Sequence, residues 1–320
     1  MYIKDIIESS KSGNRPVNGT YVLSKYELKS FRGKPGNYIQ CELVDKSGSV
    51  RGMIWDRVES IQRQIKKGMV VDVSGESTRY NDAPQIIISL INESSNYDIS
   101  NFLPSLTPEK KDHLFQVITN LMSTIDGEIY KHIWNICLIS ERISTKFKEC
   151  PGGIGDVHHS YLGGLIEHTL SVIGICNYLS MTETPEPLDR DLTLTGALIH
   201  DIGKIESYNW SIALEMSDAG RLLHHTTIGY GIFKDIARDI NLSEKDPTFL
   251  KLAHIIISHH ENEGHREAMF PEAHAISKAD ALDAQLIHSL EFIKNPENKV
   301  EGSNWTSFCK LTNRYYYKGS

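Results

Sequence analysis

Residues 196–204 read GALIHDIGK, and this stretch decides how the second half of the chain folds. An apolar segment leads into His200 and Asp201. An imidazole beside a carboxylate in an apolar helix costs free energy to bury unless a metal ion or a hydrogen-bonded ion pair compensates. Because one His-Asp pair is a weak signal, the stretch predicts further polar partners on neighbouring helices.

Helical periodicity on both sides of this stretch places more histidines and aspartates on apolar faces. His168 shares a face with Leu165 and Val172, and Asp280 follows Ile276 at helical spacing. The inward-facing set is His168, His200, Asp201, His225, His259, His260 and Asp280. Any one of them alone is more often an ordinary core residue. Together, as unrelated buried polar groups, they would be costly, so the set predicts a metal site.

The donor atoms of this set are nitrogen and oxygen, without thiolate sulfur. Such ligands favour Mn²⁺, with Fe, Mg, Ni or Co as alternatives, over structural zinc. The set is larger than one ion needs, which predicts two divalent ions. Asp201 is the expected bridge between them because it lies centrally among these residues in the sequence and on the apolar face of its helix.

The first part of the chain has a different pattern. Residues 15–95 read as five short strands with one polar helix around 57–66, between the third and fourth strands. This order predicts a small all-β OB barrel, with a tight hairpin at 45–48. The residues expected to contact a nucleic acid are Lys34, Tyr38, Arg51, Trp55, Arg79 and Tyr80. Tyr38 and Trp55 lie in strongly alternating strands, so a place in the barrel core is the alternative for both.

A polar segment separates this barrel from the helical part. It ends at Thr107 and Pro108, a cap and a first residue typical of a helix N-terminus. Amphipathic stretches follow over 109–125 and 128–146. The chain is therefore expected to be multidomain, with an OB-fold nucleic-acid-binding domain over 1–95, a linker over 96–108 and an all-α domain over 109–320.

Composition limits the classes of protein to consider. The 320 residues carry a formal net charge of −7, which argues against holding nucleic acid by surface charge alone. Residues 1–100 hold 14 Lys and Arg against 12 Asp and Glu, so most of the acid lies in 101–320. No apolar run is long enough to span a bilayer, and the N-terminus does not read as a signal peptide. With five scattered cysteines, these features predict a cytoplasmic protein without a membrane partner.

The ligand order His168, His200-Asp201 and Asp280 resembles that of the HD phosphohydrolase superfamily. His225 and the pair His259-His260 resemble its binuclear branch. With segments 158–169, 197–204 and 279–284, the chain is similar to the YhaM-type 3′→5′ exoribonucleases over nearly its whole length. The resemblance implies an OB domain before an HD domain. It also implies a metal-dependent exonuclease that acts on single-stranded RNA, with single-stranded DNA left open, and releases nucleoside 5′-monophosphates.

The resemblance and the ligand set lead to a hypothesis for each site residue. His168, His200, Asp201 and Asp280 would hold one ion, and Asp201, His225, His259 and His260 the other. The two ions would activate a bridging water. Lys204 would stabilise charge on a phosphate oxygen, or else be a solvated lysine at the helix end.

Three further residues have expected roles around the ligands. His159 would protonate the leaving oxygen or bind substrate, with neighbouring His158 as the alternative; either could instead support the turn. Asp283 would orient a ligand from a second layer, in which His158 is also expected. The glycine-rich loop 152–157 departs from the YhaM-type relatives, because it carries an acid and no base.

Two other functions stay open. A hydrolase of this kind can act on a cyclic dinucleotide or another small nucleotide, with the barrel as a sensor or oligomerisation module. Alternatively, the chain binds single-stranded nucleic acid without catalysis, and its metal centre is structural or regulatory. Assembly into a homo-oligomer is also left open.

Overall fold

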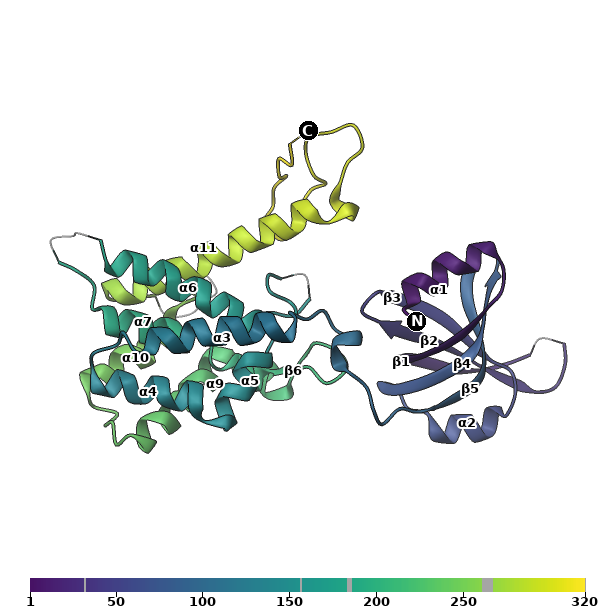
Figure 1. The fold of residues 1–320 in the computed structure, drawn as a ribbon, viewed down its shortest axis with the longest axis horizontal. Helices are drawn as coiled ribbons and strands as arrows, with labels where there is room; N and C mark the ends of the chain where they lie inside the picture. The colour runs from purple at the N-terminus through teal and green to yellow at the C-terminus, as the bar shows by residue number, and fades with distance from the viewer. Residues whose placement is uncertain (32, 156, 183–185, 261–266, 320) are drawn as a thin grey trace. The chain divides into compact units, whose positions relative to one another are not determined.

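The computed structural model describes residues 1–320 except 32, 156, 183–185, 261–266 and 320. The chain divides into two compact units (Figure 1). Unit 1 comprises Met1–Pro104 together with Ser211–Ala213, and unit 2 comprises Ser105–Trp210 and Leu214–Ser320. The predicted domain limits at residues 95 and 108 stay a prediction.

Unit 1 is a closed five-stranded barrel, which confirms the predicted OB fold. Its elements are α1 (Ile3–Ser9), β1 (Arg15–Ser30), β2 (Asn37–Asp45), β3 (Gly48–Ile54), α2 (Val58–Gln64), β4 (Met69–Tyr80) and β5 (Ala83–Glu93). The strand order is β1-β2-β3-β5-β4, and β4 pairs with β1 to close the barrel. β3 and β5 run parallel, whereas the other pairs are antiparallel. The single helix between the third and fourth strands, α2, lies where the sequence predicted it.

Alternation along the strands fills the barrel. In β2, Ile39, Cys41 and Leu43 point inward and are almost fully buried. The turn after β2 is fixed by Asp45, whose Oδ1 accepts a hydrogen bond from Ser47 N at 2.7 Å. Oδ2 of Asp45 accepts from Ile3 N at 2.7 Å, which ties α1 to the barrel.

Unit 2 is mainly helical. Its elements are α3 (Pro108–Met122), α4 (Glu128–Ile139), α5 (Glu141–Glu149), α6 (Gly164–Ser180), α7 (Arg190–Ile199), α8 (Lys204–Ser207), β6 (Tyr208–Asn209), β7 (Glu215–Met216), α9 (Asp218–Asp239), α10 (Pro247–Ser258) and α11 (Pro271–Lys294). Thr107 caps α3 and Pro108 is its first residue, as predicted. The stretch predicted over 128–146 is two helices, because Ser140 has an extended backbone (φ −67°, ψ 115°). Within the described residues, no helix is both long and apolar enough to cross a membrane.

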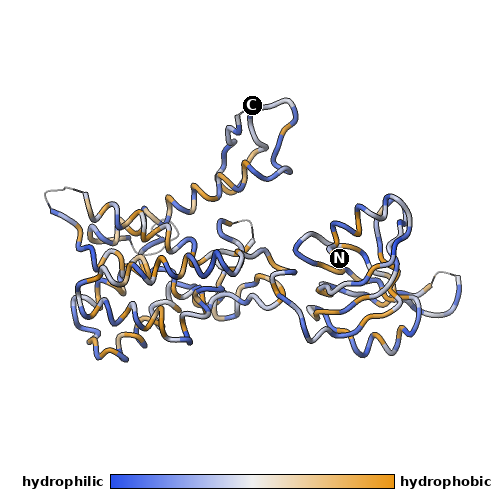
Figure 2. Tube along the Cα trace, in the orientation of Figure 1, coloured by the Kyte–Doolittle hydropathy of each residue, from blue (hydrophilic) through white to orange (hydrophobic). Residues whose placement is uncertain are grey.

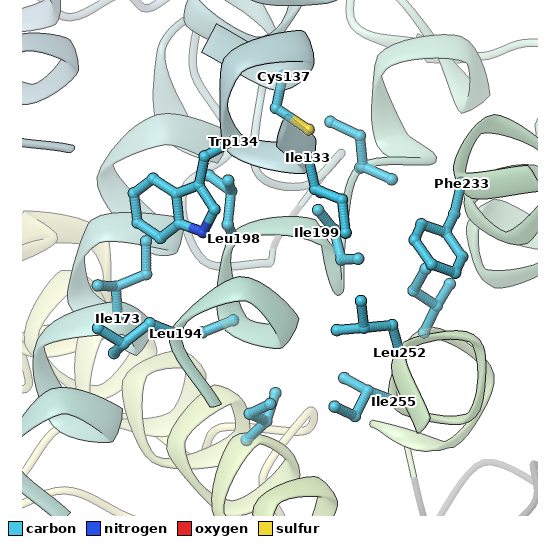
Figure 3. Close-up of a cluster of buried hydrophobic side chains, with 14 of the residues drawn as sticks. Ile133, Trp134, Cys137, Ile173, Leu194, Leu198, Ile199, Phe233, Leu252 and Ile255 are labelled. Carbon is cyan, nitrogen blue, oxygen red and sulfur yellow. The ribbon is translucent and has the colours of Figure 1, made fainter. Parts of the chain in front are cut away.

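The core of unit 2 surrounds α7. Residues 192–199 are all buried, and Figure 3 shows several of their side chains packed among those of α4, α9 and α10. Trp134 of α4 donates its Nε1 hydrogen to Thr195 Oγ1 at 2.9 Å. Gly196 permits the close approach of α10, since a Cβ there would lie 2.7 Å from Ile255 Cδ1. Hydrophobic positions recur along the helices and strands of both units in Figure 2, as inward-facing apolar sides require.

Candidate metal centre

His200 and Asp201 follow α7 directly. α7 ends at Ile199, His200 continues in helical conformation, and α8 begins at Lys204. The core around α7 encloses this turn, so His200 is 0% exposed and Asp201 only 1%. Both polar groups therefore require buried partners.

A first group of predicted ligands meets on one side of Asp201. Nε2 of His168 lies 3.2 Å from His200 Nε2 and 3.2 Å from Asp280 Oδ1. Oδ2 of Asp201 lies 3.4 Å from His168 Nε2 and 3.5 Å from His200 Nε2. These ligand atoms come from α6, α11 and the end of α7, and all lie within 4.8 Å of one another. The spacing suits a single shared cation.

A second group meets on the other side of the same carboxylate. Oδ1 of Asp201 lies 3.3 Å from His225 Nε2 and 3.5 Å from His259 Nε2. His225 Nε2 lies 3.1 Å from His260 Nε2, and the atoms of this group are again within 4.8 Å of one another. Asp201 is thus shared, with one oxygen facing each group. The structure divides these residues as the sequence did, while their role as ligands stays a prediction.

Three buried polar atoms of these groups lack a hydrogen-bond partner in the described part of the chain. They are both carboxylate oxygens of Asp201 and Nε2 of His259. In His200 and His259 the other ring nitrogen, Nδ1, is already engaged. His200 Nδ1 donates to Ala197 O at 2.8 Å, and His259 Nδ1 donates to Ile256 O at 2.9 Å. A carbonyl oxygen can only accept, so in the neutral ring each Nε2 presents its lone pair to the interior. Convergent lone pairs and carboxylate oxygens fit divalent cations.

The pKa values of the histidines fit the same interpretation. Burial lowers the pKa of His225 well below its usual value and that of His260 to about 3, so both are neutral at neutral pH. Burial also acts on His168, but hydrogen bonds to the surrounding carboxylates outweigh it and hold the pKa of His168 well above its usual value. The carboxylates therefore favour a positive charge at this position, which either a proton or a divalent cation would supply.

Lys204 is buried, so the alternative of a solvated lysine is wrong. It is 5% exposed, and its Nζ donates to Gly152 O at 2.8 Å. Nζ also lies 2.5 Å from Asp201 Oδ2, as an ion pair without hydrogen-bond geometry at the carboxylate. Burial would raise the pKa of Asp201, but Lys204 and His200 outweigh it and hold that pKa well below its usual value.

A second layer of side chains supports His168 from behind. Oδ2 of Asp283 accepts hydrogen bonds from His168 Nδ1 at 2.7 Å and from His159 Nε2 at 3.0 Å. The other ring nitrogen of His159 lies 2.9 Å from the Tyr161 hydroxyl, which donates to Glu167 Oε2 at 2.6 Å. Sequence reasoning anticipated Asp283 in this layer but missed Tyr161 and Glu167, whose only signal was their place between the histidines of 158–169.

The structure separates the two adjacent histidines that sequence reasoning left as alternatives. His159 is 1% exposed, and both of its ring nitrogens are engaged. His158 is half-buried, its ring centroid lies 5.6 Å from that of His168, and no described residue hydrogen-bonds to its ring. Burial lowers the pKa of His158 to about 4, so its imidazole is neutral at neutral pH. The acid of the nearby 152–157 loop, Asp156, lies outside the described residues.

His224, the neighbour of His225 in the chain, is a feature beside the second group that sequence reasoning missed. Its backbone (φ 64°, ψ 151°) interrupts α9, and its ring centroid lies 4.1 Å from that of His225. A side chain other than glycine rarely adopts positive φ, and such strain is concentrated at functional sites. The adjacent histidine pair was the sole signal in the sequence.

On the barrel, three predicted nucleic-acid contacts lie together. The rings of Tyr38 and Trp55 are 4.9 Å apart, and Phe31 lies 5.2 and 5.9 Å from them. Nζ of Lys34 lies 4.1 Å from the centroid of Phe31. Trp55 is 38% exposed and Tyr38 is half-buried, so the alternative that both fill the barrel core is wrong. Phe31, Lys34, Tyr38 and Trp55 form what is named here the aromatic cluster.

The other three predicted contacts lie elsewhere on the barrel. Arg51 of β3 lines a cavity of about 340 Å³ with Tyr26. Arg79 and Tyr80 end β4, where Arg79 donates to Asp82 O and Tyr80 is 60% exposed. The structure therefore joins Lys34, Tyr38 and Trp55 in one cluster and does not join the other three to it.

Two family models match the chain. The HD domain model matches residues 165–285, which include every clustered ligand, and the OB-fold nucleic acid binding domain model matches residues 22–93. The protein named 3′-5′ exoribonuclease YhaM from Bacillus subtilis (strain 168) is 24% identical over 305 residues, which cover 93% of each chain. Its namesake from Geobacillus sp. (strain WCH70) is 25% identical and covers 93% of this chain and 90% of its own. These matches support a metal-dependent hydrolase with an OB-fold domain and an HD domain.

Solved structures also match parts of the chain, and one example is an OB-fold domain. The second OB-fold domain of replication protein A from Methanococcus maripaludis is 23% identical and covers 26% of this chain and 88% of its own. Its TM-score is 0.21, which supports no conclusion about this protein.

Proposed function

We propose that the chain is a metal-dependent 3′→5′ exonuclease that shortens single-stranded RNA and releases nucleoside 5′-monophosphates. The observation that carries the proposal is the shared carboxylate of Asp201, which faces one group of buried ligands with each oxygen. RNA as substrate and the direction of cleavage follow from the names of the two relatives. Single-stranded DNA is a further candidate substrate.

In this proposal the two groups each hold one divalent ion. The first is held by His168, His200, Asp201 and Asp280, and the second by Asp201, His225, His259 and His260. The unpartnered oxygens of Asp201 and the inward lone pair of His259 support the fit. Nitrogen and oxygen donors favour Mn²⁺. Ions held by these residues would supply Lewis-acid charge to the scissile phosphate and to a water molecule beside it.

The surrounding side chains prepare these groups. Lys204 keeps Asp201 ionised. The effect of Lys204 on the charge that develops on the phosphate therefore acts through the Asp201 carboxylate. Asp283 holds the Nδ1 proton of His168 and so aims its Nε2 at the site, while His159 donates to the same Asp283 oxygen and fixes that carboxylate. The neutral ring of His158 is the better candidate to donate a hydrogen bond to substrate, because both ring nitrogens of His159 are engaged.

The barrel supplies the contact with single-stranded substrate. Bases stack on exposed aromatic rings beside basic side chains, and the aromatic cluster offers both. Beside Trp55 lies a cavity of about 750 Å³ that Arg57 and Arg63 also line. The proposal therefore assigns substrate contact to this side of the barrel, with weaker contributions from Arg51, Arg79 and Tyr80.

We place the protein in the cytoplasm. All five cysteines are buried free thiols, as a reducing compartment permits. A homo-oligomer stays a prediction.

The test incubates the full chain with Mn²⁺ and, separately, with 5′-labelled RNA, 5′-labelled DNA and a cyclic dinucleotide. We expect a ladder of shortened 5′-labelled RNA and nucleoside 5′-monophosphate as the small product. Hydrolysis of the cyclic dinucleotide with intact RNA would replace the proposal with the small-nucleotide function. RNA binding without any cleavage would support the non-catalytic function instead.

A further inference from the structure

Residues 304–318 form a short hairpin that the proposed function does not use. It follows the C-terminal end of α11 (Figure 1). Thr306 N donates to Tyr316 O at 2.9 Å, Cys309 N to Arg314 O at 2.8 Å, and Lys318 N to Asn304 O at 2.8 Å. Two antiparallel segments therefore pair across the residues between Cys309 and Arg314.

One side of this C-terminal hairpin is anchored to α11. Cys309 is 1% exposed, and its Sγ lies 3.3 Å from His288 Nε2. The ring of Tyr316 lies 5.7 Å from that of Phe292. The hairpin is thus held to the end of α11 by side chains on one face.

The opposite side carries exposed aromatic rings, because side chains of paired extended segments alternate between two faces. Tyr315 and Tyr317 flank the anchoring Tyr316 and are each 59% exposed. The ring of Trp305 lies 5.3 Å from that of Tyr317, and the ring of Phe308 lies 5.1 Å from that of Tyr315. Two aromatic pairs, each joining the two segments of the hairpin, are therefore exposed.

The charge of this segment is opposite to that of the whole chain. Residues 302–320 contain Lys310, Arg314 and Lys318 and no acidic residue, in a protein of net charge −7. Within the described residues, no carboxylate forms an ion pair with any of the three. The hairpin therefore offers aromatic rings beside uncompensated positive charge.

We propose that this face of the C-terminal hairpin binds single-stranded RNA, as a second contact besides the aromatic cluster of the barrel. The inference rests on the proposed function for the choice of RNA as the polyanion. Aromatic rings next to basic side chains suit a single strand. Every nucleotide offers a base whose ring can stack and a phosphate that carries negative charge. Aromatic residues are also enriched in protein interfaces, but lysine is depleted there, so Lys310 and Lys318 beside the rings favour a polyanion over a protein partner.

The hairpin also has a fixed relation to the metal centre, because α11 carries both. Asp280 and the anchoring Phe292 are separated by about 18 Å along the helix at 1.5 Å per residue. A strand whose 3′ end lies at the metal centre thus reaches the hairpin several nucleotides upstream. The contribution of the hairpin to affinity must therefore appear with long RNA and vanish with short RNA.

The experiment measures binding of fluorescein-labelled oligouridine to the full chain carrying Asp201→Asn, which suppresses cleavage. The double variant Trp305→Leu with Tyr317→Leu is expected to bind long oligouridine about tenfold more weakly, because leucine lacks a ring face. Lys310→Gln with Arg314→Gln is expected to reduce the slope of log affinity against log salt by about 1.4. Tyr178→Leu, an exposed aromatic position on α6, is the matched control and is expected to change neither.

The outcomes separate the hairpin from the proposed function. Unchanged affinity of the leucine variant for long oligouridine overturns the hairpin's role. The role is also overturned if Trp305→Glu lowers the molecular mass measured by light scattering but leaves RNA affinity unchanged. That result would assign the face to contact with a second copy of the chain. RNA cleavage by the unsubstituted chain is scored independently, and its absence contradicts the proposed function whatever the binding data show.

Discussion

Nδ1 of His168 lies 2.7 Å from Oδ2 of Asp283, and both side chains are almost fully buried. Asp283 follows Asp280 by one turn of α11, and Asp280 faces the other ring nitrogen of the same histidine at 3.2 Å. One helix therefore supplies a carboxylate that faces the candidate metal centre and a second carboxylate that orients the histidine opposite it. Such outer contacts fix the tautomer and raise the basicity of a ligand.

Asp283→Ala tests this relationship. Without the acceptor, the Nδ1 proton and the ring orientation of His168 are no longer fixed, so we expect metal affinity to fall about 10–100-fold. The measurement titrates metal-free protein with Mn²⁺ and follows RNA cleavage. Gln285→Ala, at an exposed position of α11, is the control. An unchanged half-saturating Mn²⁺ concentration in the Asp283 variant would show that the carboxylate does not orient the ligand.

Asp201→Asn tests the shared carboxylate. The substitution keeps the shape of the side chain but removes the charge that both ligand groups use. We expect cleavage to fall by more than about 100-fold, beyond the usual effect of an outer contact, and bound metal to decrease. Metal analysis by mass spectrometry and single-turnover cleavage measure the two effects. Asp235→Asn, in a surface pair with Arg238, serves as control. Full metal content with full activity in the Asp201 variant would exclude a bridging role.

Lys204→Met tests charge balance around Asp201. Removing one partner of a buried ion pair leaves the other uncompensated, so metal-free protein should lose about 3–5 kcal/mol of unfolding free energy. A bound cation supplies the missing charge, so Mn²⁺ should recover much of this loss. Urea unfolding with and without Mn²⁺ measures both values. In Lys131→Met, which breaks an exposed pair with Glu128 that water screens, we expect no comparable loss. Equal losses in the two variants would contradict the assigned ion pair.

Trp55→Leu tests the aromatic cluster of the barrel. Stacking of one base on an aromatic ring contributes about 1–3 kcal/mol, so RNA affinity should fall by at least about fivefold. Tyr80→Leu should have a smaller effect, because Tyr80 ends β4 and forms no part of the cluster. Fluorescence anisotropy with labelled RNA measures both, with Tyr97→Leu as an exposed control on unit 1. A larger loss in Tyr80→Leu would place the main contact at the β4–β5 hairpin.

The local elements of this protein follow from the sequence because their causes are local. The alternation of Ile39, Cys41 and Leu43 defines β2, and Thr107 with Pro108 defines the start of α3. The helical spacing that turned His168 and Asp280 inward also follows from neighbouring residues alone. Family resemblance then joined the separate ligands into one set. The amphipathic pattern over 128–146 predicted a single helix, but the extended backbone of Ser140 divides this stretch into two helices.

The sequence by itself thus determined the order of the two domains and the inward direction of His168, His200, Asp201 and Asp280. The tertiary structure alone decided which oxygen of Asp201 faces which group, that Lys204 is buried against it, and that Trp55 lies outside the barrel core. The same holds for the link from Asp283 to His159, residues 124 positions apart. These are contacts through space between distant elements, and side-chain direction at the end of an element depends on packing partners that local periodicity does not specify.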